Sequence, residues 1–212
     1  MTILYIETNF LMSIAEGQDP QADLLLFNPP PSIQIYIPNI CYIEAIAVFK
    51  QKKQAITNFT KIMNERRREA RRDLSSNHAQ SLAVNLDQAI IDNNYLLNDL
   101  DTRLSRAIDR QQARSRCIYL ENQILQNTCS AMLTQPEQML VRNDLMDNLI
   151  LRTIIHHATL PTSPRQEKAF ISNNTKDFDQ PEVKDALRNA GIRYFTMTQH
   201  FLDWFNNSRS SN

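Results

Sequence analysis

The sequence has 212 residues, of which 42% are hydrophobic and 22% charged, a composition typical of a globular protein with one buried core. Lysine and arginine together number 23, as do aspartate and glutamate, so the net charge does not select a nucleic-acid or membrane partner. Only two glycines are present, which excludes the glycine-rich phosphate-binding loops of P-loop and dinucleotide-binding proteins.

Cysteine usage and the N-terminal residues bear on the cellular compartment. The three cysteines, Cys41, Cys117 and Cys129, are widely spaced and odd in number, so we expect reduced thiols and a cytoplasmic protein. Glu7 interrupts the apolar N-terminal run and no basic residue precedes it, so we expect no signal peptide. No stretch of 18 apolar residues occurs, and we therefore expect no membrane segment.

Short apolar runs rich in β-forming residues predict four strands. Helix signals follow three of them: Thr8 as the cap of a helix through Ala15, Pro38 leading directly into a helix that carries Glu44, and Thr198 as the cap of a last helix through Phe205. Repeated strand and helix units favour a parallel sheet covered by helices. In chain order, the predicted strands are residues 2–6, 33–37, 169–172 and 192–195.

The middle of the chain, residues 45–133, contains neither glycine nor proline and predicts helix almost throughout. The first long helix is expected to end near Arg72, because the Ser-Ser-Asn sequence at residues 75–77 marks a break. A second helix follows, and a third is expected to begin near residues 114–117 and to run to Met132.

Carboxylates are predicted at the places where strands end. In a parallel sheet the carboxyl ends of the strands share one edge, so acids there are expected to converge. Several carboxylates gathered without equal numbers of cationic side chains repel one another unless divalent cations neutralise them, and oxygen ligands suit Mg²⁺ or Mn²⁺. Ions held in this way can activate water for attack on a phosphodiester. The acids concerned are Glu7, Glu44 and Asp177, with Asp144 and Asp147 at the start of another helix.

These residues resemble the successive motifs of PIN-domain nucleases. The resemblance covers both ends of the chain, roughly residues 2–49 and 140–206, and the strand and helix at residues 192–205 are similar to the closing elements of that fold. The motifs that carry it are Ile6-Glu7-Thr8-Asn9-Phe10-Leu11, Ile37-Pro38 with Ile43-Glu44-Ala45, Asp147-Asn-Leu-Ile150, and Ile171-Ser-Asn-Asn-Thr-Lys-Asp-Phe178.

The resemblance implies an α/β fold of three layers, with a central parallel sheet flanked by helices and a long helical insertion in the middle of the chain. It implies a single PIN-like domain over residues 1–206, followed by a frayed tail at residues 207–212. Its α/β parts are expected at about residues 1–49 and 140–206, and the helical arm or insertion at about residues 50–139.

The resemblance also implies a catalytic metal site. Its ligands are expected to be Glu7, Glu44, Asp147 and Asp177, with Asp144 as a further ligand. Asn9 and Ser172 are expected to orient these carboxylates by hydrogen bonds, and Asn174 stands where many members carry an acid. The first acid of the family is usually aspartate, and Glu7 is longer by one methylene, which alters the position of any bound metal.

Less specific interpretations of these acids stay open. Acids in the first turn of a helix favour its macrodipole without further function, which applies to Asp144 and Asp147. Asp177 fits an Asx turn or a helix cap, while Glu7 and Glu44 could be ordinary surface acids.

Basic residues on the helical arm form a candidate track for the phosphates of RNA. The alternative is a solvated helix face in which neighbouring acids balance these charges. The apolar stripe from Leu82 to Ile108 exceeds what one domain covers, which suggests a homodimer through the helical region. The candidate RNA-binding residues are Lys52, Lys53, Arg67, Arg71, Arg110 and Arg114.

The leading hypothesis is therefore a Mg²⁺- or Mn²⁺-dependent endoribonuclease that hydrolyses single-stranded RNA. It is either a toxin, which predicts a small antitoxin-like protein partner, or a stand-alone RNA-processing enzyme. The alternative is a PIN-like module that binds RNA or mediates assembly without cutting, and a third hypothesis is a metal-dependent phosphoesterase acting on DNA or nucleotides.

Overall fold

The computed structural model describes residues 1–142, 144–160 and 166–210, and its centre is a five-stranded sheet. The strand order is β3-β2-β1-β4-β5, and every neighbouring pair is parallel. Strand β1 lies in the middle and is buried along its whole length, which explains its uninterrupted apolar sequence. The strands are β1 (Thr2–Ile6), β2 (Ile33–Pro38), β3 (Arg116–Ile118), β4 (Glu167–Ile171) and β5 (Ile192–Phe195).

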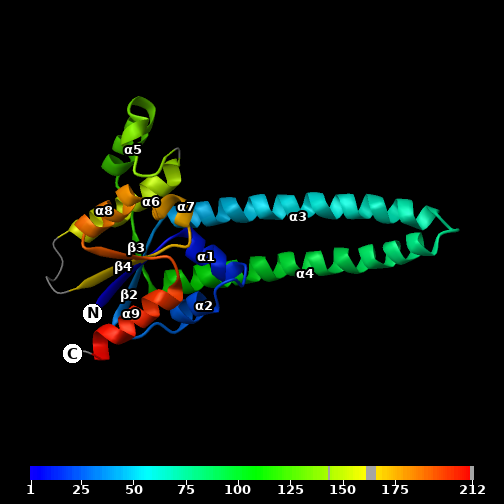
Figure 1. Cartoon of the computed structure of the whole chain (residues 1–212), viewed down its shortest axis with the longest axis horizontal. Coiled ribbons are helices and arrows are strands. Elements are labelled where there is room, and N and C mark those ends of the chain that lie inside the picture. Colours follow the sequence, from blue (N-terminus) through cyan, green and yellow to red (C-terminus); the bar gives the residue numbers. More distant parts are fainter. Residues whose placement is uncertain (143, 161–165, 211–212) are drawn as a thin grey trace.

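Helices cover both faces of the sheet, with α6 and α8 on one side and α2 and α9 on the other (Figure 1). This arrangement confirms the predicted three-layer α/β fold. The helices are α1 (Thr8–Ala15), α2 (Pro20–Phe27), α3 (Ile40–Arg72), α4 (Asn77–Arg114), α5 (Asn122–Thr134), α6 (Leu145–Thr159), α7 (Thr175–Phe178), α8 (Pro181–Asn189) and α9 (Thr198–Ser210), with a 3₁₀ turn, η1, at Pro136–Gln138.

Helices α3 and α4 pair as a long antiparallel hairpin that projects from the body of the protein (Figure 1). Side chains that recur every seven residues lie in the seam between the two helices, as in a coiled coil. Polar contacts join them as well, because Asn93 Nδ2 donates to Thr60 Oγ1 at 2.9 Å and Asp87 accepts from both Arg67 and Arg71. The break between the helices falls where the sequence predicts it, with Ser76 as the N-cap of α4.

The predicted third helix is wrong at its start. Residues Arg116–Ile118 form the edge strand β3, which pairs in parallel with β2, and α5 begins only at Asn122. Asn39 fixes this strand, since its backbone N–H donates to Ile118 O at 2.8 Å and its Oδ1 accepts from the Leu120 N–H at 3.0 Å. The projecting arm therefore ends at the end of α4, and the chain up to residue 139 returns to the body.

Two helix ends also differ from prediction. Thr8 is the first residue of α1 rather than its cap, because the Glu7 side chain occupies the N-cap position. Helix α9 continues to Ser210, so residues 207–210 are helical where a frayed tail was expected, and residues 211–212 lie outside the described part of the chain.

Two further findings concern the cysteines and the helices. All three cysteines are free thiols, and Cys41 is buried next to the end of β2. None of the helices in the described ranges is long and apolar enough to cross a membrane.

Candidate active site

Glu7 follows directly on the last residue of β1 and is almost fully buried, with 1% of its surface exposed. Its carboxylate folds back over the start of α1, where Oε2 accepts the backbone N–H of Asn9 at 2.6 Å. Ser172, at the end of β4, also donates a hydrogen bond to the carboxylate, whereas Glu7 Oε1 is buried without a hydrogen-bond partner. A buried oxygen with no donor is available to a cation or a proton.

Glu44 lies in the second turn of α3, the helix that follows β2. Thr8 Oγ1 donates a hydrogen bond to Glu44 Oε2, so residues from the ends of two neighbouring strands meet. The position of Glu44 was predicted from the sequence, but this contact with Thr8 was not. Thr8 is polar and directly follows the first acid, which is the signal that could have identified it.

Asp147 lies in the first turn of α6 and has 6% of its surface exposed. Its Oδ2 accepts a hydrogen bond from Asn174 Nδ2 at 3.0 Å, and the backbone N–H of Asn174 donates to Ser172 Oγ at 3.0 Å. Asp144 is the N-cap of α6, with Oδ1 accepting the Asp147 backbone N–H at 3.0 Å. The loop after β4 and the start of α6 are thereby joined through side chains.

Asn148 was missed by the sequence analysis, although it directly follows Asp147. It is completely buried, and its Nδ2 donates to the carbonyl oxygens of Val141 and Asp144, both at 2.6 Å. Its Oδ1 accepts the Val141 backbone N–H at 3.2 Å. Asn148 therefore fixes the loop that leads into α6 and holds Asp144 and Asp147 in position.

Replacing Asn148 with alanine should lower the free energy of unfolding by roughly 2–4 kcal/mol, because three backbone groups of the buried loop lose their partner. For a protein of this size, the loss corresponds to a fall of ~5–15 °C in Tm, measurable by thermal unfolding. The control is Asn98→Ala at an exposed position of α4, which should leave Tm within ~2 °C of wild type. Equal Tm values for the two variants would contradict this function of Asn148.

The carboxylates are close enough to raise one another's pKa. Burial raises the pKa of Glu7 to about 8. The charges of Asp147 and Glu44 contribute to this rise, whereas hydrogen bonds from Asn9 and Ser172 oppose it. Burial also raises the pKa of Asp147 to about 7, with added repulsion from Asp144, Glu44 and Asp177. The pKa of Glu44 is raised by burial and by Asp144.

The donor set fits a hard divalent cation. All five side chains offer oxygen, and none forms an ion pair with lysine, arginine or histidine in the part of the chain that the structure describes. Across residues 1–142, 144–160 and 166–210, however, no three acidic, histidine or cysteine side chains are close enough to hold an ion as they stand. Carboxylates that repel one another are expected to come closer only when positive charge joins them.

A pocket of about 720 Å³ adjoins these acids. Asp144 and Asp177 line it, and so do two cationic side chains that the sequence analysis did not single out, Arg142 and Lys176. The pocket is therefore polar: Asp144, Asp177, Glu137 and Glu182 give it negative charge, and Arg142 in the loop before α6 and Lys176 in α7 give it positive charge. Such a pocket suits a substrate whose phosphate approaches the acids.

The PIN-domain family model matches residues 4–178, most of the chain and all five acids. The chain belongs to the PIN-domain family. None of the curated proteins matches the chain. Among solved structures, the crystal structure of VapBC2 from Rickettsia felis bound to a DNA fragment from their promoter is similar, with 13% identity and a TM-score of 0.38 over 91% of this chain and 98% of that chain.

The cationic residues predicted to bind RNA are dispersed relative to these acids. Lys53 is exposed on α3, and no described side chain of this group lines the pocket beside the acids. The side chain of Arg114 lies outside the described residues. The others have contacts within the chain: Lys52 with Glu16 at 3.0 Å, Arg67 and Arg71 with Asp87 at 2.7 Å and 2.5 Å, and Arg110 with the carbonyl oxygen of Phe27.

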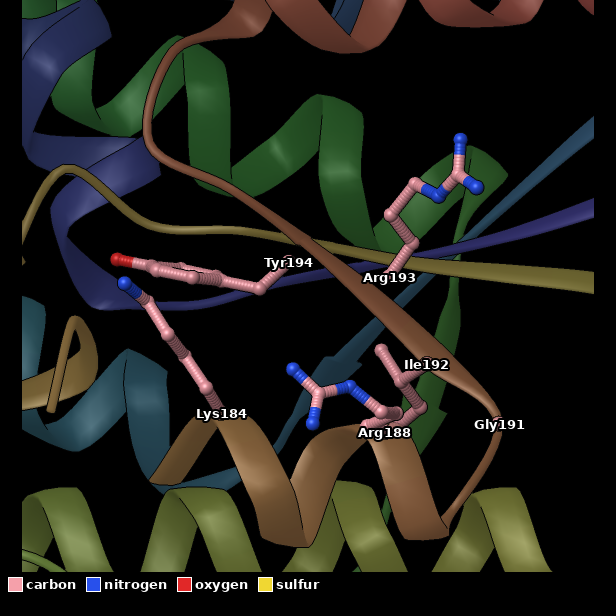
Figure 2. Close-up of a pocket in the computed structure, with 6 residues that line it drawn as sticks. All are labelled: Lys184, Arg188, Gly191, Ile192, Arg193 and Tyr194. Atoms are coloured by element: carbon pink, nitrogen blue, oxygen red, sulfur yellow. The ribbon is translucent and has the colours of Figure 1, made fainter. Parts of the chain in front are cut away.

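A second pocket of the PIN domain, about 460 Å³, lies between α8 and β5 (Figure 2). Lys184 and Tyr194 point toward one another there, while Arg193 points away on the other side of β5 (Figure 2). Its positive charges are already engaged in contacts within the chain. The contacts are Lys184 with Asp179 at 2.7 Å, Arg188 with Asp185 at 2.7 Å, and Arg193 over the Trp204 ring at 5.1 Å.

Proposed function

We propose that this PIN domain is a metal-dependent endoribonuclease that hydrolyses phosphodiester bonds of single-stranded RNA. Membership of the PIN-domain family supports this proposal, because PIN domains are generally nucleases. The observation that carries the proposal is that Glu7, Glu44 and Asp147 come from three different elements and raise one another's pKa, with Glu7 and Asp147 buried and Glu44 half-buried, and that none of them pairs with a cationic side chain of the described residues. A fold that needed these residues only for stability would gain nothing from such repulsion.

Glu7, Glu44, Asp147 and Asp177 would hold Mg²⁺ or Mn²⁺, with Asp144 at the rim. The bound ion would supply an activated water and stabilise the negative charge that develops on the phosphate. The chain's own contribution is orientation: Ser172 holds Glu7, Thr8 holds Glu44, and Asn174 holds Asp147. Each contact fixes one carboxylate oxygen and leaves the other free for a ligand.

The substrate strand is proposed to enter through the pocket lined by Asp144 and Asp177. Arg142 and Lys176 line this pocket, and in this proposal they would contact phosphates of the bound strand. The same chemistry serves a toxin whose small antitoxin-like partner covers this pocket, or a stand-alone RNA-processing enzyme. Both proposals require metal-dependent cleavage of single-stranded RNA.

Incubating the full chain with a labelled pool of single-stranded RNA should give cleavage products with Mn²⁺ or Mg²⁺ and none with EDTA. The measurement is the initial rate of product formation, compared with single-stranded DNA and free nucleotides under the same metal. Faster cleavage of DNA or nucleotides than of RNA would favour another phosphoesterase. Cleavage that persists in excess EDTA would contradict the metal site.

A second candidate is a PIN domain that binds RNA or mediates assembly without cutting. It is favoured by Glu7 in place of the usual aspartate and by the finding that no three acids of the described residues are close enough to hold an ion as they stand. RNA binding that is equally tight with Mn²⁺ and with EDTA, with no cleavage under either condition, would support this candidate and reject the nuclease.

A further inference from the structure

One side of the α3–α4 hairpin carries large apolar side chains that nothing in the described chain covers. The exposed fractions are 56% for Phe59, 55% for Ile62, 49% for Leu82 and 62% for Leu96. Soluble monomers rarely expose a contiguous apolar patch of this kind, so it is a candidate interaction surface. The hairpin face is defined here as Ala55, Phe59 and Ile62 of α3 with Leu82, Ala89 and Leu96 of α4.

The register of the hairpin places these residues on the same side. The ion pair between Arg67 and Asp87 and the hydrogen bond between Thr60 and Asn93 show which residues of the two helices oppose each other. In α4, each of the three face residues immediately precedes a residue of the seam, as Phe59 does in α3. In an antiparallel pair of helices, positions that precede seam residues lie beside one another on one side. The α4 pairs are Leu82 with Ala83, Ala89 with Ile90, and Leu96 with Leu97; the α3 pair is Phe59 with Thr60.

A groove at the base of the hairpin supports this placement. It has a volume of about 340 Å³, and residues of both helices line it together with the end of α1. Ala55 and Leu96 belong both to this groove and to the hairpin face, so the face continues from the groove toward the tip. Helix α1 covers the face at its base only, because α1 ends at Ala15 while the hairpin extends well beyond the body (Figure 1).

The charges around the face fit a second copy of the chain better than a strongly charged partner. Both signs occur at its base and again farther out, in three ion pairs within the chain, while Asp92, between Ala89 and Leu96, accepts a hydrogen bond from Gln88. An identical surface therefore meets little net repulsion, and no large excess of one sign selects an acidic or basic partner. The pairs are Lys52 with Glu16 at 3.0 Å, Arg103 with Asp99 at 3.3 Å, and Arg66 with Glu69 at 2.9 Å.

The size of the face is also that of a stable interface. From Ala55 to the level of Leu82, which lies opposite Arg71, it extends about 17 residues along α3, roughly 25 Å, and two helices side by side are about 20 Å wide. Each copy therefore offers roughly 500 Å², and a symmetric pair buries about 1,000 Å², the area that a biological interface is expected to reach.

We propose that two copies of this chain associate through the hairpin face and that the two hairpins form a four-helix bundle. A two-helix hairpin buries only one stripe of each helix, and a second hairpin supplies the missing layer. The dimer does not depend on nuclease activity, since none of the residues of the hairpin face belongs to the candidate active site.

The test is the mass of the full-length protein in solution, measured by sedimentation equilibrium between roughly 1 and 100 µM without metal or RNA. Wild type is expected to be a dimer, twice the chain mass of 24.6 kDa. Leu96→Glu should weaken the dimer at least ~100-fold, because two copies bring carboxylates into an apolar interface. Phe59→Glu tests the same surface from α3 and should have the same effect.

Val84→Glu is the matched control. Val84 belongs to the same helix and is 67% exposed, close to the 62% of Leu96, but it lies away from the hairpin face. The control should remain dimeric, and all three variants should keep the helical circular dichroism of wild type. A monomeric wild type would overturn the proposal and leave the face to a different protein. Dissociation by Val84→Glu, or a dimer insensitive to both Leu96→Glu and Phe59→Glu, would overturn it as well.

Discussion

Asp147→Asn should reduce metal-dependent RNA cleavage at least ~100-fold, the usual effect of removing one charged group that acts directly in the chemistry. Asparagine has the same shape, and its carbonyl oxygen can still accept the hydrogen bond that Asn174 gives to Asp147. The variant therefore removes a negative charge with little change in packing. Glu44→Gln should have a similar effect, since Thr8 can donate to an amide oxygen as well as to a carboxylate.

The measurement is the single-turnover rate at saturating Mn²⁺, with RNA binding determined separately. Asp101→Asn, at an exposed position of α4, is the control for loss of one carboxylate and should cleave at the wild-type rate. Both site variants should retain RNA binding and should be no less stable to heat than wild type without metal, because each relieves repulsion among buried acids. A cleavage rate within a few-fold of wild type in Asp147→Asn would remove this residue from the catalytic group.

The placement of these acids could be predicted because it depends on topology. Apolar strands followed directly by helices predict a parallel sheet, and the carboxyl ends of such strands share one edge whatever the loops do. Glu7 and Glu44 follow β1 and β2, which are neighbours in the sheet, and Asn174 follows β4, on the other side of β1. Asp147 begins a helix rather than ending a strand, so topology alone does not place it beside the others, and the family resemblance supplied its expected function as a metal ligand.

The contacts that orient the acids could not be predicted in this way. Strand β3 has three residues, too few for any periodicity, and it forms because β2 offers a free edge. Whether Glu7 or Thr8 caps α1 depends on the conformation of one side chain, since Glu7 folds back to accept the Asn9 N–H. The three hydrogen bonds of Asn148 join it to a loop that has no sequence signature of its own.

Glu7→Gln should stabilise the metal-free protein at alkaline pH and flatten the dependence of its stability on pH. Burial raises the pKa of Glu7 from 4.5 to about 8, so the folded protein retains a proton that the unfolded chain releases. The stability that this proton confers is complete below pH 4.5 and is lost as the pH rises through about 8. Wild type should therefore lose stability steadily from about pH 5 to pH 8.

The expected gain for Glu7→Gln is roughly 2–4 kcal/mol at pH 9, less than the full shift implies because one end of the buried amide still lacks a partner. The measurement is urea unfolding in EDTA from pH 5 to pH 9. Asp147, whose pKa is about 7, should leave a residual slope between about pH 4 and pH 7. Glu65→Gln, at an exposed site on α3, is the control and should follow the wild-type curve.

Adding Mn²⁺ separates the electrostatic cause from other effects of the substitution. A cation replaces the protons of the acids, so it should stabilise wild type more at pH 8.5 than at pH 6. In Glu7→Gln this gain should shrink, because one ligand no longer ionises. If the free energies of unfolding of wild type and Glu7→Gln in EDTA change in parallel with pH, Glu7 is already ionised at neutral pH. That result would contradict the inferred repulsion among these acids.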